Sequence, residues 1–229
     1  MINHIRAILW KQLKDTVKNK TILIQFIMFP CMTVIMEKAV HIQGMTEHFF
    51  ANLFAVMYIG MAPLTSIAAL ISEEKEKNTL RVLQMCNVKA FEYLLGNAIY
   101  IVSVCMIGSL VIGLAGDYTR IELLYFMIIS FLGHNISVLL GAMIGLNSRN
   151  QMAATSVSVP VMMIFSFLPM LSMFNQTIRN IAKYIYSEQL FVLINSLDRI
   201  HINVENIMIL LCNIVIITAL FLVTYRRIL

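Results

Sequence analysis

The sequence predicts an all-α integral membrane protein with six transmembrane helices, built as a single transmembrane domain over residues 1–229. Hydrophobic residues make up 59% of the chain and its mean hydropathy is +0.81, well above the range of soluble domains. A helix rises about 1.5 Å per residue, so roughly 20 apolar residues cross the ~30 Å hydrocarbon layer. Six segments of the chain lack Asp, Glu, Lys and Arg, and backbone amides in lipid must pair internally, which only helices achieve here. The charge-free segments are Thr21–Met36, Phe49–Ser72, Tyr93–Gly116, Leu123–Ser148, Asn150–Ile178 and Asn206–Tyr225.

Residues 1–20 are predicted to form an interfacial helix on the membrane surface. Apolar residues recur three or four positions apart on one face, beginning with Ile2, Ile5 and Leu9. Trp10 suits the headgroup layer, and basic residues lie largely elsewhere on the helix. An ordinary solvated helix is the alternative, but the direct continuation into an apolar segment favours the interfacial one. The candidate interfacial residues are Trp10, Lys11, Lys14 and Lys18.

The predicted spans cover residues 22–40, 49–71, 93–115, 123–146, 152–174 and 204–224. The first is the least apolar, because Gln25 and Pro30 lie inside it. No small-residue cleavage site follows it, so we expect it to remain as an anchor rather than be removed as a signal peptide. Gly141 and Gly145 in the fourth span have the small-x-x-x-small spacing that permits close helix contact.

Two stretches outside the spans have helical character. After a charge run that begins at Ser72, Thr79–Met85 reads as a short amphipathic helix with Leu80, Val82 and Leu83 as apolar positions. Residues 176–203 are too polar to span and too apolar for a solvated linker. They predict short helices dipping into the outer leaflet before the last span, at about 177–200.

The distribution of basic residues predicts that both termini are cytoplasmic. With that orientation, all but five of the 17 Lys and Arg residues fall on the inside, as the positive-inside rule requires. The five outside are Lys38, Arg120, Arg179, Lys183 and Arg199.

Known catalytic patterns are missing from the sequence. It has no phosphate-binding loop, no His-Glu-x-x-His pair and no Gly-x-Ser-x-Gly elbow. Glu73-Glu74 lacks the Arg of the intramembrane prenyl protease pattern, because Asn78 stands at that position. The four cysteines form no Cys-x-x-Cys pair and are interpreted as packing residues. We therefore expect no catalytic site, no bound cofactor and no metal in this chain, and no nucleic-acid partner.

His134 is the one histidine inside the predicted spans. A proton relay and a structural histidine hydrogen-bonded to a neighbouring helix are both open, and the nearby Asn135 and Ser137 favour the structural role. One histidine gives little support to ion coupling. The energy source is thus expected to be another polypeptide.

The loop Ser72-Glu-Glu-Lys-Glu-Lys-Asn-Thr-Leu-Arg-Val-Leu, followed by Val88-x-x-Phe-Glu-x-Leu-Leu-Gly96, resembles the cytoplasmic loop of ABC type-2 export permeases. The interfacial helix, six spans, Asn150-Gln151 and the outer helices agree with that family along nearly the whole chain. Asn78 replaces the family's usual glycine, although asparagine also tolerates a left-handed backbone. Cys86-Asn87 replaces its common Ser-Pro.

The resemblance implies a permease subunit without its own ATPase, paired with a second permease chain and with two ATP-binding cassette subunits that bind ATP and Mg. It places a coupling helix at about 73–85 and also implies that the interfacial helix touches the ATPase. The coupling residues it implies are Glu73, Glu74, Lys75, Glu76, Lys77, Thr79, Leu80, Arg81 and Leu83.

Prolines inside the spans can kink helices and so supply gating elements, and methionines give an adaptable apolar surface. The candidate gating or lining residues are Pro30, Pro63, Pro160, Met163 and Pro169. An apolar lining without fixed charges suits a hydrophobic or amphipathic cargo such as a peptide, drug or lipid.

These observations predict an exporter permease in a bacterial cell membrane, either a homodimer or a heterodimer. The alternative is a stand-alone protein, either an ion-coupled secondary transporter or a membrane enzyme acting on lipids. A third interpretation is an immunity component against a membrane-active peptide, which overlaps the first because such systems often are exporters.

Overall fold

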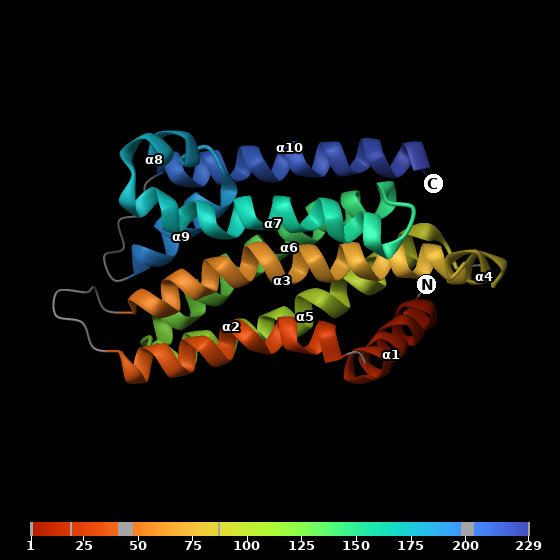
Figure 1. Ribbon diagram of the computed structural model, residues 1–229, viewed down its shortest axis with the longest axis horizontal. Coiled ribbons are helices and arrows are strands. Elements are labelled where there is room, and N and C mark those ends of the chain that lie inside the picture. Colours follow the sequence, from red (N-terminus) through yellow and green to blue (C-terminus); the bar gives the residue numbers. More distant parts are fainter. Residues whose placement is uncertain (1, 19, 41–47, 87, 198–203, 229) are drawn as a thin grey trace.

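The structure is a computed structural model that describes residues 2–18, 20–40, 48–86, 88–197 and 204–228. Those residues form helices and no strand, and the long helices lie side by side along one axis (Figure 1). The chain ends and α4 lie at one end of the bundle, whereas α8 and α9 lie at the other. The helices are α1 (Ile2–Lys18), α2 (Lys20–Ala39), α3 (Phe49–Glu76), α4 (Thr79–Met85), α5 (Ala90–Ala115), α6 (Arg120–Asn147), α7 (Gln151–Phe174), α8 (Gln176–Ala182), α9 (Tyr186–Asn195) and α10 (Val204–Ile228).

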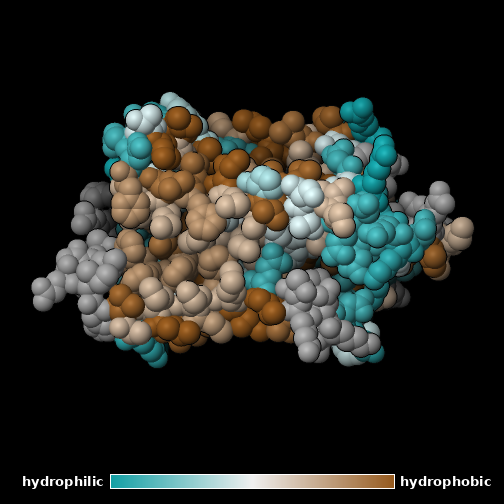
Figure 2. Space-filling view, in the orientation of Figure 1, coloured by the Kyte–Doolittle hydropathy of each residue, from teal (hydrophilic) through white to brown (hydrophobic). Residues whose placement is uncertain are grey.

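Five helices in the described residues are long and apolar enough to cross a membrane, namely α3, α5, α6, α7 and α10. Figure 2 shows the corresponding surface, where apolar residues cover the middle of the bundle and hydrophilic residues gather at the α4 end. The predicted span at 22–40 corresponds to α2, which is not among the five. An all-helical, multi-pass membrane protein is therefore confirmed, and the count of six spans stays a prediction.

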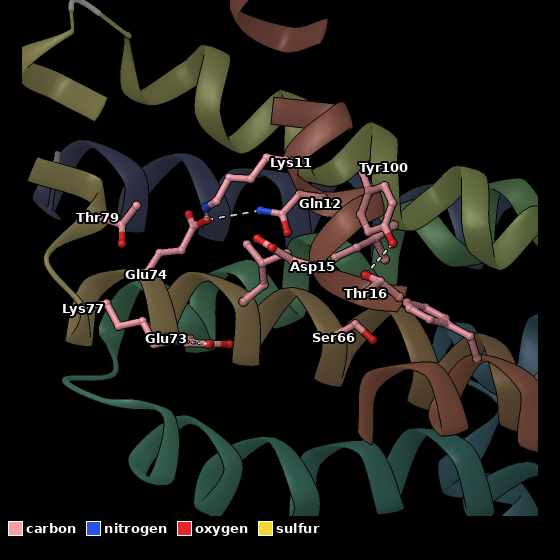
Figure 3. Close-up of a pocket in the computed structure, with 13 residues that line it drawn as sticks. Lys11, Gln12, Asp15, Thr16, Ser66, Glu73, Glu74, Lys77, Thr79 and Tyr100 are labelled. Carbon is pink, nitrogen blue, oxygen red and sulfur yellow. Dashed lines mark hydrogen bonds and ion pairs between the residues drawn. The ribbon is translucent and has the colours of Figure 1, made fainter. Parts of the chain in front are cut away.

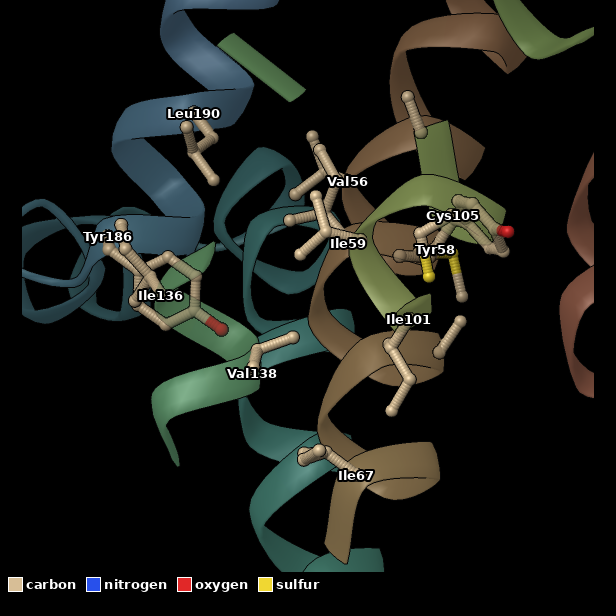
Figure 4. Packing of buried hydrophobic residues seen from close by; sticks show 14 of the residues in the cluster. Val56, Tyr58, Ile59, Ile67, Ile101, Cys105, Ile136, Val138, Tyr186 and Leu190 are labelled. Atoms are coloured by element: carbon tan, nitrogen blue, oxygen red, sulfur yellow. The ribbon is translucent and has the colours of Figure 1, made fainter. Parts of the chain in front are cut away.

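The helix at the centre of the bundle is α3. It contacts α2, α5, α6, α7 and α9, and most of its length is buried. In the core, Ile59 and Ile67 of α3 lie with Ile101 and Cys105 of α5 and Val138 of α6 (Figure 4). A displacement of α3 must therefore be felt by most of the other helices, because close-packed interiors transmit strain.

Close packing of α6 on α3 depends on the two glycines singled out in the sequence. A Cβ atom on Gly141 would lie 2.1 Å from the carbonyl oxygen of Leu64, and one on Gly145 would lie 3.0 Å from that of Ala68. The small-x-x-x-small pattern thus marks a helix contact at which the two backbones approach each other directly.

The predicted boundaries after the second span need correction. The charged residues 73–76 are the last turn of α3, so the segment 73–85 is not one helix. Glu and Lys are good helix formers, and Glu73 and Lys77 pair four residues apart, so the helix runs on past the apolar segment. Asn78 then adopts a left-handed conformation (φ 54°) and ends it, as its substitution for glycine predicts. The short helix predicted at Thr79–Met85 is confirmed as α4.

The outer helices predicted at 177–200 are α8 and α9, and residues 198–200 lie outside the described part of the chain. All but one of the α9 residues 186–194 are buried, and α9 contacts α3, α6, α7 and α10. It is consequently part of the bundle's core rather than a helix resting on its surface.

Candidate functional site at the charged end of α3

The charged end of α3, residues 73–77, connects three separate parts of the molecule. Its side chains alternate around the helix because successive residues are about 100° apart. One side of this helical turn faces α1, and another side faces the turn between α6 and α7. After residue 77 the chain continues into α4. The charge run, which the resemblance placed within one coupling helix at about 73–85, is therefore divided among distinct contacts.

Glu74 connects α3 to the N-terminal helix α1. Its side chain is buried, with 6% of the residue exposed, and Oε1 accepts hydrogen bonds from Gln12 Nε2 at 3.1 Å and from Lys11 Nζ (Figure 3). A buried carboxylate is stable only when it is paired and hydrogen-bonded, and these two donors supply both conditions at Oε1, whereas the buried Oε2 has no hydrogen-bond partner among the described residues. Glu74 is thus an internal contact and does not face solvent.

Lys75 and Glu76 connect α3 to the ends of two other helices. Lys75 Nζ donates to the carbonyl oxygens of Leu146 and Ser148, both at 2.6 Å, where the last turn of α6 leaves carbonyls unpaired. Glu76 Oε2 accepts from the backbone N–H of Gln151 at 3.0 Å, at the first turn of α7. A cation at a helix C-terminus and an anion at an N-terminus both complement the helix dipole.

Glu73 and Lys77 form an ion pair at the surface, beside the start of α4. The Glu73 carboxylate is the main cause that raises the pKa of Lys77, and Asp15 and Glu76 add smaller contributions. Of the predicted coupling residues in the charge run, Glu76 and Lys77 are exposed, Glu73 and Lys75 are partly buried, and Glu74 is buried.

The short helix α4 lies at the end of the bundle and extends beyond the ends of the long helices (Figure 1). Leu83 packs against the core cluster, whereas Val82 and Met85 are 57% and 85% exposed. Thr79 lines a pocket beside α1. The side chains of Leu80 and Arg81 lie outside the described residues.

The helix α1, predicted to be interfacial, packs along α5. His4 Nδ1 lies 2.8 Å from Glu92 Oε2, Tyr100 donates to Thr16 Oγ1 at 2.5 Å, and Ile8 is buried against Gly96. Trp10 is exposed, and the Lys14 ammonium lies 5.1 Å from the centre of its ring. Of the four predicted interfacial residues, Lys11 alone bonds to the charged end of α3; the Lys18 side chain is outside the described residues.

Pro30, Pro63, Pro160 and Pro169 lie inside α2, α3 and α7, which continue through them as helices. Pro160 and Met163 are exposed on α7, whereas Pro30, Pro63 and Pro169 are buried. These residues do not come together with the charged end of α3, and their gating role stays a prediction.

His134 is fully buried and its Nε2 lies 2.8 Å from Ser109 Oγ of α5. Tyr58 lies edge-on to its ring, with 5.7 Å between the ring centres. The favoured interpretation, a histidine hydrogen-bonded to a neighbouring helix, agrees with this contact, although the partner is Ser109 rather than Asn135 or Ser137.

Sequence reasoning missed Gln12, which holds Glu74, and the backbone groups of Leu146, Ser148 and Gln151. Gln12 follows the buried Ile8 by one helical turn, so a polar residue on a buried face was the available indication. Backbone partners carry no side-chain signature at all. Among the described residues, no group of three or more His, Cys, Asp or Glu side chains is placed to hold a metal ion.

Comparison with known proteins agrees with this architecture. The family described as "ABC-2 family transporter protein" matches residues 3–225, which is nearly the whole chain. A search among curated proteins found no match. On the strength of the family match and the apolar helices, the chain belongs to the ABC-2 transporter family and is a multi-pass membrane permease component of an ABC transporter.

Proposed function

We propose that this permease forms the membrane pathway of an ABC exporter, moving a hydrophobic or amphipathic substrate such as a peptide, drug or lipid outward. ATP and Mg bind to a separate ATPase, two copies of which sit below two permease chains. The observation that carries the proposal is the position of α4, which presents exposed apolar residues at the end of the bundle and is directly continuous with the central helix α3.

The docking surface for the ATPase is the exposed part of α4, with Val82 and Met85 as its apolar contacts. Short amphipathic helices bind partners by seating apolar residues in a groove. Glu73 and Lys77, which are accessible, can pair with charges around that groove and set its register. Glu74 is excluded from that role by its burial and instead holds α1.

Motion of α4 passes to the pathway through the charged end of α3. Glu74 transmits it to α1, while Lys75 and Glu76 transmit it to the turn between α6 and α7. Because these contacts are made by adjacent residues on one helical turn, α1, α6 and α7 must move together with α4. The cargo path lies between the two permease copies, where the exposed face of α7 offers Pro160 and Met163.

The test is a matched pair of substitutions on exposed valines at opposite ends of the bundle. Val82→Asp places a charge on the docking surface, and Val204→Asp places the same charge on α10, where the native valine is 69% exposed. Each variant is co-expressed with the cognate ATPase and purified through the permease.

A docking role predicts that Val82→Asp loses the copurifying ATPase and its ATP hydrolysis, whereas Val204→Asp retains both. The permease purified alone hydrolyses no ATP. Retention of a fully active complex by Val82→Asp would remove α4 from the ATPase interface.

A further inference from the structure

A pocket of about 570 Å³ lies between α1 and α3, bordering the charged end of α3. Figure 3 shows Lys11, Gln12 and Asp15 of α1 on one side and Glu73 and Glu74 of α3 on the other. Side chains of α2 and α5 also line it. Its volume falls within the range of about 300–1,000 Å³ typical of small-molecule sites.

The pocket has an apolar part and a charged part. Phe26, Leu70 and Ile101, which are all buried, supply apolar surface from three different helices. Hydroxyl groups of Thr16, Ser66 and Tyr100 also line it. A ligand that fills this space therefore needs an apolar portion as well as a polar head.

The charges that line the pocket leave one carboxylate unbalanced. Lys11 pairs with Glu74 and Lys77 pairs with Glu73, but Asp15 forms no ion pair with any described residue. Among the described side chains that line the pocket, three carboxylates, including the exposed Asp15, stand against two ammonium groups, which favours a cationic ligand over an anionic one. A bare metal ion is not favoured, because Asp15 does not belong to any cluster of potential metal ligands in the described residues.

We propose that this pocket binds an organic ammonium group carried on an apolar chain, with the ammonium at Asp15 and the chain against Phe26, Leu70 and Ile101. The site lies beside the interfacial helix, where an amphiphile in the adjoining leaflet can reach it. The ammonium can come from an aminophospholipid headgroup or from a soluble cationic amphiphile. This binding goes beyond the proposed function, since it requires the permease alone and no ATPase.

The test is photo-crosslinking of the full chain in nanodiscs of phosphatidylglycerol, whose headgroup carries no ammonium. The probe is dodecylamine carrying a diazirine in its chain, which is protonated at pH 7 because alkylamines titrate near 10.4. Labelled peptides are mapped by mass spectrometry, with dodecanol and dodecanoate as competitors of the same length. Asp15→Asn removes the unbalanced charge, and Asp117→Asn is the matched control on the exposed turn at the other end of the bundle, where a left-handed backbone (φ 53°) accepts asparagine.

Labelling is expected on peptides of α2, α3 or α5, with competition by dodecylamine and not by dodecanol or dodecanoate. Asp15→Asn lowers labelling about fivefold, the change expected for one partly solvated charge contact, and Asp117→Asn leaves it unchanged. Adding phosphatidylethanolamine to the nanodiscs assigns the source: suppression identifies an aminophospholipid, and persistence identifies a soluble amphiphile. Equal labelling of Asp15→Asn and wild type, or equal competition by dodecanol, would overturn the proposal.

Discussion

The contact between Glu74 and α1 can be measured by a double-mutant cycle. Lys11→Met removes the ammonium and keeps the length of the side chain, and Glu74→Gln removes the charge while keeping an acceptor for Gln12. The Lys11 side chain is 39% exposed, so its attraction to Glu74 is screened and the pair is expected to contribute about 1 kcal/mol rather than the several expected of a buried pair. Glu74→Ala costs more, about 2–3 kcal/mol, because the buried amide of Gln12 then loses its partner.

The assay follows thermal unfolding in nanodiscs at one fixed scan rate. Cys105 is fully buried, so a thiol-reactive dye reports its exposure on unfolding once Cys31, Cys86 and Cys212 are replaced by alanine. For a chain of this length, 1 kcal/mol corresponds to roughly 2–4 °C in Tm. Lys11→Met and Glu74→Gln should each lower Tm by about that amount, and the double variant should be no worse than the more damaging single one.

Lys14→Met is the matched control, because Lys14 lies on the same helix, is exposed, and contacts Trp10 rather than Glu74. Its effect should add to that of Glu74→Gln within about 0.5 kcal/mol, as for independent sites. If Lys11→Met and Glu74→Gln were equally additive, the assignment of Glu74 as the contact that holds α1 would be refuted.

Three further predictions concern the same helix. Lys75→Met should destabilise by about 1–2 kcal/mol, because the carbonyls of Leu146 and Ser148 at the end of α6 lose a charged donor. Lys77→Met at the exposed pair should cost less than half of that, and equal losses of Tm in nanodiscs would contradict the capping role of Lys75. Asn78→Ala should lower the free energy of unfolding by about 1 kcal/mol, whereas Asn78→Gly should leave it unchanged or raise it, since only glycine adopts the left-handed backbone freely. If denaturation showed the alanine variant to be as stable as the glycine variant or more so, the left-handed turn would not be strained. Gly141→Ala should lower the Tm by the equivalent of about 3 kcal/mol or abolish expression, because the new methyl group meets the Leu64 carbonyl. Gly96→Ala should cost less, because its methyl group meets the Ile8 side chain and no backbone atom. Similar yields and Tm values for the two variants would show that α6 does not pack on α3 in this register.

The spans were predictable because lipid leaves the backbone few choices. Charge-free segments located α3, α5, α6, α7 and α10 to within a few residues. The error at the end of α3 arose from equating the end of the apolar segment with the end of the helix. Residues 73–76 continue the helix because Glu and Lys are good helix formers, and the helix ends at the left-handed backbone of Asn78.

The burial of α9 is a feature that the sequence did not predict. Ser187, Glu188 and Gln189 are consecutive polar residues in a stretch predicted to dip into the outer leaflet, yet all three are buried within the bundle. Glu188 is accommodated because Ser172 of α7 donates a hydrogen bond to its carboxylate at 2.8 Å. A polar partner supplied by another helix is invisible to periodicity, so the sequence could predict helices here but not their burial.

The candidate site was located from the sequence, but its internal organisation was not. The charge run and the amphipathic stripe at Thr79–Met85 drew attention to one end of the molecule, and its role at an ATPase interface stays a prediction. The separate contacts that Glu74 and Glu76 make depend on residues about 60 to 75 positions away, such as Gln12 and Gln151. Hydrogen bonds of such long sequence separation follow from the packing of whole helices, which no local pattern encodes.

The central claim is that α4 lies in the cytoplasm and docks on the ATPase, and the native thiol of Cys86 tests it directly. Cys86 is exposed immediately after α4, so a chain retaining it and lacking Cys31 and Cys212 carries one accessible thiol among the described residues. A membrane-impermeant maleimide should label it in inside-out vesicles but not in right-side-out vesicles, and bound ATPase should protect it. Labelling from the outside, or labelling unaffected by a bound ATPase, would contradict the account.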